Sequence, residues 1–125
     1  MAIELAITGT ARMTVTDADT AKSHGTGDVD VLSTSRLLQL MQQATIAAID
    51  GHLPDDMITA GMRINLDHLN GSPVGAEVVA TATLIRIEGR RLVFEAEAVS
   101  EGITVGMGRI IRVQIDRESF LSRLN

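Results

Sequence analysis

The stretch Ser-Thr-Ser-Arg-Leu-Leu-Gln-Leu-Met-Gln-Gln-Ala-Thr-Ile-Ala-Ala-Ile-Asp-Gly, residues 33–51, decides the fold because it predicts one long helix. Ser33 or Thr34 can accept a hydrogen bond from a free backbone N–H at its start, and Gly51 can end it in the left-handed conformation. On a helical wheel its polar residues fill a sector only roughly 60° wide; they are Arg36, Gln39, Gln43 and Asp50. We therefore expect other elements to cover this helix on most sides.

Gln42 interrupts this pattern, because it falls about 60° outside the polar sector, between Ile46 and Ile49. One interpretation places it at the edge of the solvated stripe. The other places its amide inside a pocket, where its donors and its acceptor need partners. The helical pattern leaves both interpretations open.

Alternation of apolar and polar residues predicts five strands around this helix: residues 3–16 before it, and 58–68, 76–87, 91–100 and 103–115 after it. Residues 17–32 are rich in Asp, Gly, Ser and Thr and predict a loop. Asp116 can cap a short C-terminal helix.

Short turns between the last four strands imply an antiparallel sheet. The sequence therefore predicts a single α+β domain over residues 1–125, in which a curved five-stranded antiparallel sheet wraps around one central helix. This is the hot-dog architecture. A sheet of this size leaves edge strands unpaired, so we expect a homodimer, and whether dimers pair again stays open.

The strand at 58–68 places one histidine relative to the helix. Strict alternation puts Ile58, Ala60, Met62, Ile64 and Leu66 on one side, and continuing it puts His68 on that side as well. Gly61 and Asp67 would lie on the opposite side. If the strand reaches residue 68, His68 enters the core layer; if the strand ends earlier, His68 lies in a turn.

Composition excludes several classes of function. A net charge of −5 and an aromatic content of 2% argue against nucleic acid as the main partner. The absence of cysteine excludes disulfides, thiolate nucleophiles and thiolate metal sites. The N-terminus has neither a basic leader nor a long apolar run, so we expect a cytoplasmic protein without a membrane anchor.

Four segments resemble the fluoroacetyl-CoA thioesterase-like branch of the hot-dog thioesterases: residues 31–44, 60–75 (Ala-Gly-Met-Arg-Ile-Asn-Leu-Asp-His-Leu-Asn-Gly-Ser-Pro-Val-Gly), 88–94 and 105–112. Together the resemblance covers roughly residues 7–121. It implies a catalytic threonine, glutamate and histidine, with a glycine N–H near the substrate. Thr34, His68 and Gly61 match three of these positions, and Gln42 stands where the family has glutamate.

The resemblance implies an acyl-CoA thioesterase, and Gln42 modifies the mechanism because an amide can neither attack nor take a proton at neutral pH. Water would attack the thioester, with His68 as base or proton shuttle, Thr34 and Gln42 as positioning groups, and the Gly61 N–H on the carbonyl oxygen. No metal or cofactor is expected beyond the coenzyme A thioester itself. Further candidate substrate contacts are Asn70, Arg36 and Arg112, the arginines through coenzyme A phosphates.

Bland alternatives accompany these roles: Thr34 as the helix N-cap and Gly61 as a site of backbone packing. Gln42 also supports a second function, a non-catalytic protein that binds acyl-CoA or acyl-carrier protein. A third, an enoyl-CoA hydratase or dehydratase, needs an acid partner for the histidine, and Asp67 is expected on the wrong face. The acyl group is not determined by the sequence.

Overall fold

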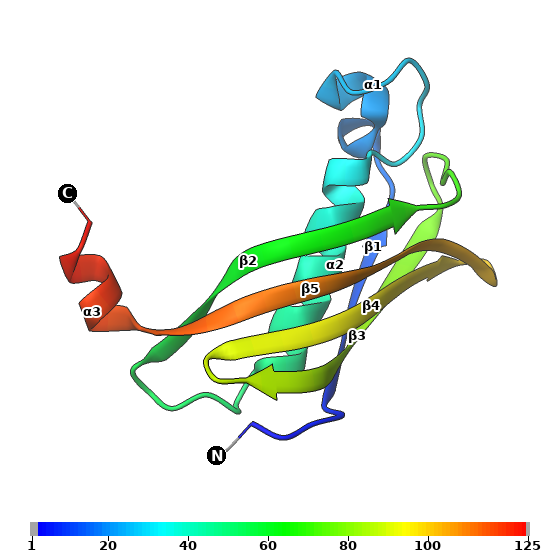
Figure 1. Cartoon of the computed structure of the whole chain (residues 1–125). Coiled ribbons are helices and arrows are strands. Elements are labelled where there is room, and N and C mark those ends of the chain that lie inside the picture. Colours follow the sequence, from blue (N-terminus) through cyan, green and yellow to red (C-terminus); the bar gives the residue numbers. More distant parts are fainter. Residues whose placement is uncertain (1–2, 125) are drawn as a thin grey trace.

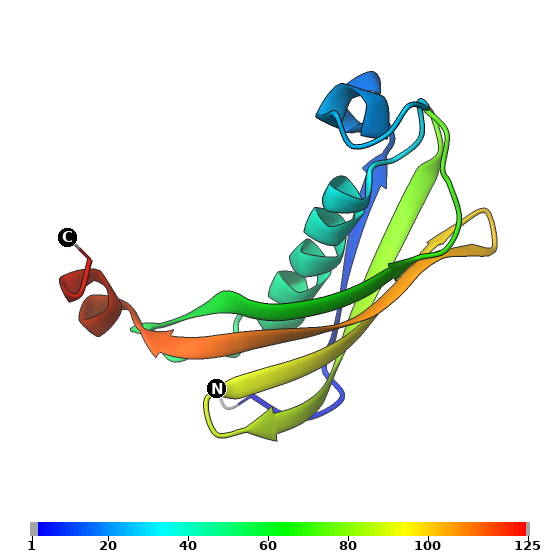
Figure 2. The same cartoon turned by 45° about the horizontal axis from the view of Figure 1, so that its top comes forward.

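The computed structural model describes residues 3–124. One long helix, α2 (Thr34–Ile49), lies along one face of a curved antiparallel sheet, and the sheet curls around it (Figures 1 and 2). The strand order is β1-β3-β4-β5-β2. The strands are β1 (Thr8–Thr14), β2 (Met57–His68), β3 (Glu77–Glu88), β4 (Arg91–Ser100) and β5 (Ile103–Asp116). The predicted α+β hot-dog architecture is confirmed.

The ends of the chain and the first connection differ in detail from the prediction. β1 begins at Thr8 rather than at residue 3, and the expected loop at 17–32 contains two single turns, η1 (Asp17–Asp19) and α1 (Ala21–His24). Turns this short carry no detectable periodicity. Asp116 does cap α3 (Arg117–Ser122), by accepting from the Ser119 N–H at 2.9 Å. No helix within residues 3–124 is long and apolar enough to cross a membrane.

Small residues let α2 approach the sheet closely. Ala44 of the helix and Ala80 and Ala82 of β3 are fully buried. A Cβ atom on Gly9 of β1 would collide with the helix backbone at Ala44, Ala47 and Ala48. Larger side chains fill the space around this contact; those fully buried include Leu37, Leu40, Met41, Leu84, Leu92 and Phe94. Burial of this apolar surface is the main stabilising term of the fold.

One side of α2 stays open, so the expectation that the helix is covered on most sides is wrong for a single chain. Ile46 is 49% exposed although it is apolar, and Ala47 beside it is exposed as well. The reason is that the sheet covers the helix from β1 and β3, whereas β2 lies farther along the curl (Figure 2). Gln42 lies at the margin of this open side and is half-buried.

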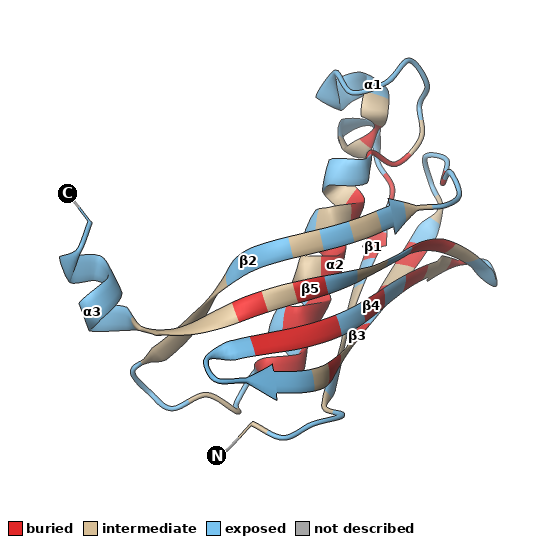
Figure 3. Cartoon of the chain, viewed as in Figure 1, coloured by how far each residue is buried: buried red, intermediate tan, exposed pale blue. Residues whose placement is uncertain are grey.

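β2 is an edge strand with an irregular middle. It pairs only with β5 within the described chain, and most of it is exposed or partly exposed (Figure 3). Gly61 pairs with Arg112 and Arg63 pairs with Ile111, so Met62 is an extra, bulged residue. The bulge shifts the alternation by one residue. The prediction of one unbroken phase along this strand is therefore wrong, and Gly61 faces the helix side, as His68 does.

Candidate active site

The first group of site residues joins the end of β2 to the start of α2. β2 extends through His68, whose side chain shares the helix-facing side with Ile64 and Leu66, so the turn interpretation is wrong. His68 Nδ1 lies 2.8 Å from the Thr34 hydroxyl oxygen. His68 Nε2 is buried and has no hydrogen-bond partner among residues 3–124. A hydroxyl and an imidazole at this distance can exchange a proton.

Thr34 is free for this contact because its neighbour caps the helix. Ser33 Oγ accepts from the Arg36 N–H at 3.0 Å, which makes Ser33 the N-cap, and it also bonds His24 Nδ1 at 2.7 Å. The interpretation of Thr34 as the N-cap is therefore wrong. Thr34 is exposed, and its hydroxyl lies at the positive end of the α2 dipole, beside the histidine.

His68 is poised as a base. Burial lowers the pKa of His68 below its usual value, and the Asn70 backbone opposes that shift only in part. The ring is therefore neutral at pH 7, and Nδ1 can accept the hydroxyl proton of Thr34.

The second group lies at the bulge. A Cβ atom on Gly61 would be 2.9 Å from Gln42 Oε1 and 3.8 Å from Arg112 Nη1. The glycine therefore leaves the space into which the Gln42 amide extends. Arg112 is only 5% exposed; its Nε donates to Thr59 Oγ1 at 2.9 Å and its Nη2 donates to the Thr59 carbonyl at 3.3 Å. Thr59 could not be predicted as part of this group, because unbroken alternation along the strand would place it on the outer face and only the bulge turns it toward the helix.

The two groups lie apart in one chain. Gly61 and His68 are seven residues apart on β2, which corresponds to roughly 20 Å. Thr34 and Gln42 are eight residues apart on α2, which corresponds to roughly 12 Å. Thr34, Gln42 and His68 therefore do not surround a common pocket within a single chain. The chain therefore holds two separate half-sites, the Thr34–His68 pair and the Gln42–Gly61–Arg112 group.

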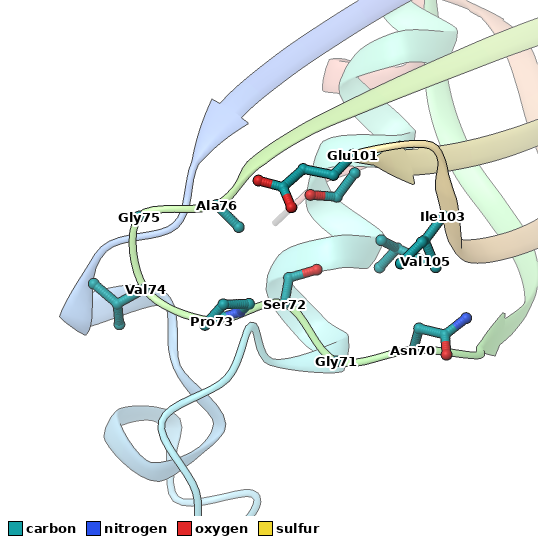
Figure 4. A pocket seen from close by; sticks show the side chains of 11 residues that line it. Asn70, Gly71, Ser72, Pro73, Val74, Gly75, Ala76, Glu101, Ile103 and Val105 are labelled. Atoms are coloured by element: carbon teal, nitrogen blue, oxygen red, sulfur yellow. The ribbon is translucent and has the colours of Figure 1, made fainter.

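The remaining candidate substrate contacts have other partners. Asn70 Nδ2 donates to the Thr104 carbonyl at 2.7 Å and holds the connection after β2 against β5. It borders a groove of about 480 Å³ between residues 70–76 and the β4–β5 turn (Figure 4). Arg36 forms an ion pair with Asp19 at 3.3 Å and fastens η1 to the start of α2. Arg112, in contrast, is too deeply buried to reach a phosphate on the surface.

The fold and the two half-sites define a hot-dog protein of the thioesterase type. The model of the fluoroacetyl-CoA-specific thioesterase family matches residues 15–118, and the chain belongs to this family. One relative, the fluoroacetyl-CoA thioesterase of Streptantibioticus cattleyicolor, is 30% identical over 95 residues, which are 76% of this chain and 68% of the relative.

Solved structures agree on the fold. A crystal structure of the fluoroacetyl-CoA thioesterase superimposes with a TM-score of 0.88 at 24% identity and covers 98% of this chain and 96% of its own. A thioesterase-superfamily member from Thermus thermophilus gives 0.89 at 24% identity, over 96% and 89% of the two chains. A hot-dog-like protein from Thermanaerovibrio acidaminovorans gives 0.88 at 24% identity, over 97% and 90%.

Proposed function

We propose that this protein is a homodimeric acyl-CoA thioesterase that hydrolyses its substrate by attack of water. The observation that carries the proposal is the 2.8 Å contact between the Thr34 hydroxyl and Nδ1 of a half-buried, neutral His68. Family membership supports it, and a variant of the related fluoroacetyl-CoA thioesterase has been solved in complex with acetyl-CoA.

The proton path follows from which nitrogen is within reach. Because Nε2 is buried, water delivers its proton to the Thr34 oxygen while the Thr34 hydroxyl proton passes to His68 Nδ1. The water oxygen bonds to the thioester carbonyl carbon, and the Gly61 N–H donates to the carbonyl oxygen as it becomes negative. The carbon–sulfur bond then breaks, and the imidazolium returns the proton to the coenzyme A thiolate. Gln42 orients the water or the acyl group.

A dimer through β2 would complete each site. The free edge of β2 can pair antiparallel with its copy about a two-fold axis at residue 65, so that residue 66 lies opposite residue 64 and residue 67 opposite residue 63. Because Met62 is extra to the pairing, that register places His68 opposite Gly61 of the partner subunit. Thr34 and His68 of one chain would then face Gln42 and Gly61 of the other. Ile46 on the open side of α2 and Met62 in β2 itself are both exposed, and such a dimer would bring the partner subunit next to them.

Complementation tests both the chemistry and the shared site. Free thiol release is measured from short, branched, aromatic and long acyl-CoAs with the wild type, His68→Ala and Gly61→Val. Each variant alone should lose at least about 100-fold in kcat/KM. The two variants are then dissociated, mixed in equal amounts and allowed to form dimers again. About a quarter of wild-type activity should return, because half of the dimers would contain one chain of each variant and each of these would hold one intact site. No recovery from variants that form dimers would refute the shared site.

A non-catalytic binding protein is the second candidate, and Gln42 favours it because the family position is a glutamate. Gln42→Glu distinguishes the two functions. An inactive wild type whose activity is gained by Gln42→Glu would identify a binder that keeps the architecture of the enzyme. A hydratase finds no support, because Asp67 is exposed on the outer face of the sheet, in a groove with Asn65 and Arg109.

A further inference from the structure

Arg112 carries a buried positive charge that the proposed hydrolysis does not use. Its side chain enters the space between sheet and helix from β5, and it donates hydrogen bonds to two neutral oxygens of Thr59. A guanidinium has five N–H donors, and those on Nη1 make no hydrogen bond within residues 3–124, although Nη1 is not fully enclosed. Burial lowers the pKa of Arg112, yet a guanidinium stays protonated in proteins.

Other arginines of the chain contrast with it. Those with a carboxylate within ion-pair distance are Arg12, Arg36, Arg86 and Arg109. Even Arg36, the most buried of this set, has the carboxylate of Asp19 at 3.3 Å. Arg112 is more buried than any of them and has no such partner in the described part of the chain. Buried charges in proteins are normally paired, so this position calls for an anion.

The space between Arg112, Gly61 and Gln42 suits the carboxylate of a ligand. Gly61 has no side chain, and the site where its Cβ would stand is 3.8 Å from Arg112 Nη1. On the far side of that space is Gln42 Oε1, and its neutral amide leaves the guanidinium without a counter-charge. A carboxylate here would accept hydrogen bonds from the unused guanidinium N–H groups, and a 180° turn of the Gln42 amide would put its NH2 group in the place of Oε1.

We propose that Arg112 and Gln42 select acyl-CoA thioesters whose acyl group ends in a carboxylate, that is, short dicarboxylic acyl groups. The inference rests on the proposed thioesterase site, in which the thioester carbonyl meets Gly61. Since Arg112 Nη1 lies just beyond that glycine, the distal carboxylate reaches it across a chain of the length found in malonyl or succinyl groups. A neutral acyl group of the same length leaves the guanidinium unpaired.

The test compares succinyl-CoA with butyryl-CoA. The wild type should favour succinyl-CoA by on the order of 100-fold in kcat/KM. Arg112→Gln should bring this ratio to about 1, and Arg112→Lys, which keeps the charge without the two-pronged donor, should retain part of it. Gln42→Glu leaves Arg112 in place but sets a carboxylate beside it, so it should reduce the ratio at least about 10-fold even if Arg112→Gln fails to fold.

A binding measurement separates this inference from hydrolysis. Calorimetry with S-carboxypropyl-CoA and S-butyl-CoA, which cannot be hydrolysed, should show the same preference in the wild type and its loss in Gln42→Glu. If neither thioester is hydrolysed but the carboxylated analogue binds more tightly, the charge selection stands and the enzyme proposal fails. Equal binding of the two analogues, or an equal loss of both activities in Arg112→Gln, would overturn the inference.

Discussion

Gly61→Ala tests the second half-site directly. The added methyl carbon would stand 2.9 Å from Gln42 Oε1, so the amide must retreat by roughly 0.5 Å to reach an ordinary contact. The obstructing atom is the end of a flexible side chain, so we expect the free energy of unfolding to change by less than about 1 kcal/mol. Misplacement of a positioning group on this scale costs about 10- to 100-fold in rate.

The assay is thiol release at saturating and limiting acyl-CoA, with thermal unfolding followed by far-UV circular dichroism, because the chain has no Trp or Tyr to report by fluorescence. Gly71→Ala is the matched control: its methyl carbon would lie in ordinary contact, 3.6 Å from a Val31 methyl. The control should keep both activity and Tm. Wild-type kcat/KM in Gly61→Ala would refute the role assigned to the Gln42 amide.

Three further predictions follow from other contacts. Gly9→Ala should destabilise the fold by at least about 3 kcal/mol in urea unfolding, because its Cβ meets the α2 backbone, including the Ala47 carbonyl carbon at 2.7 Å; an unchanged midpoint would contradict the close packing of β1 on α2. The kcat/KM profile should rise with pH and reach half its plateau below pH 6.5, since burial keeps His68 neutral to lower pH; by linkage, the stability from this neutral ring is complete above pH 6.5 and declines as pH falls toward the lowered pKa. Thr34→Val should lose about 100-fold in kcat while Thr34→Ser retains most of it, and an acyl adduct on Thr34 in rapid-quench mass spectrometry would replace water attack by direct attack of the hydroxyl.

The sequence was sufficient for the layers of the fold because its periodicities are long. The helix α2 has 16 residues and the strands β2 to β5 have 10–14. Over such lengths the helical period of about 3.6 residues is easily distinguished from the two-residue alternation of a strand. The N-cap stayed ambiguous between Ser33 and Thr34, because both hydroxyls suit that position. The structure resolves it through the bond from Ser33 Oγ to the Arg36 N–H, which leaves Thr34 for His68.

The arrangement of the site was less accessible, because it depends on pairing between distant segments. Gln42, Gly61 and Arg112 come from α2, β2 and β5, and their proximity is set by the register of β2 against β5. The bulge could not be predicted because Met62 is apolar and fits the predicted alternation of β2. In the structure Met62 is extra to the pairing and 39% exposed. The division into two half-sites becomes visible only with the 2.8 Å contact between Thr34 and His68, which places His68 at the start of α2 while Gln42 lies eight residues farther along the helix.

The bulge makes one last prediction, in which deletions at two nearby positions lower the stability by very different amounts. Removing Met62 leaves Gly61, Arg63 and Ile64 as consecutive residues of a regular strand, and both halves of β2 keep the faces that they have now. Removing Asn65 instead shifts the phase of everything after it, so that Leu66 turns away from the helix.

The first deletion should therefore remain folded, with a loss of about 1–2 kcal/mol, whereas the second should lose cooperative unfolding or several times that stability. Thermal melts by circular dichroism distinguish the two outcomes. The deletion of Met62 also tests whether the bulge is needed for the site, because it straightens the strand between Gly61 and His68. We expect kcat/KM to fall strongly although the free energy of unfolding changes little. Equal damage from both deletions would mean that β2 does not change phase at Met62, and the inward orientation of Gly61 would need another explanation.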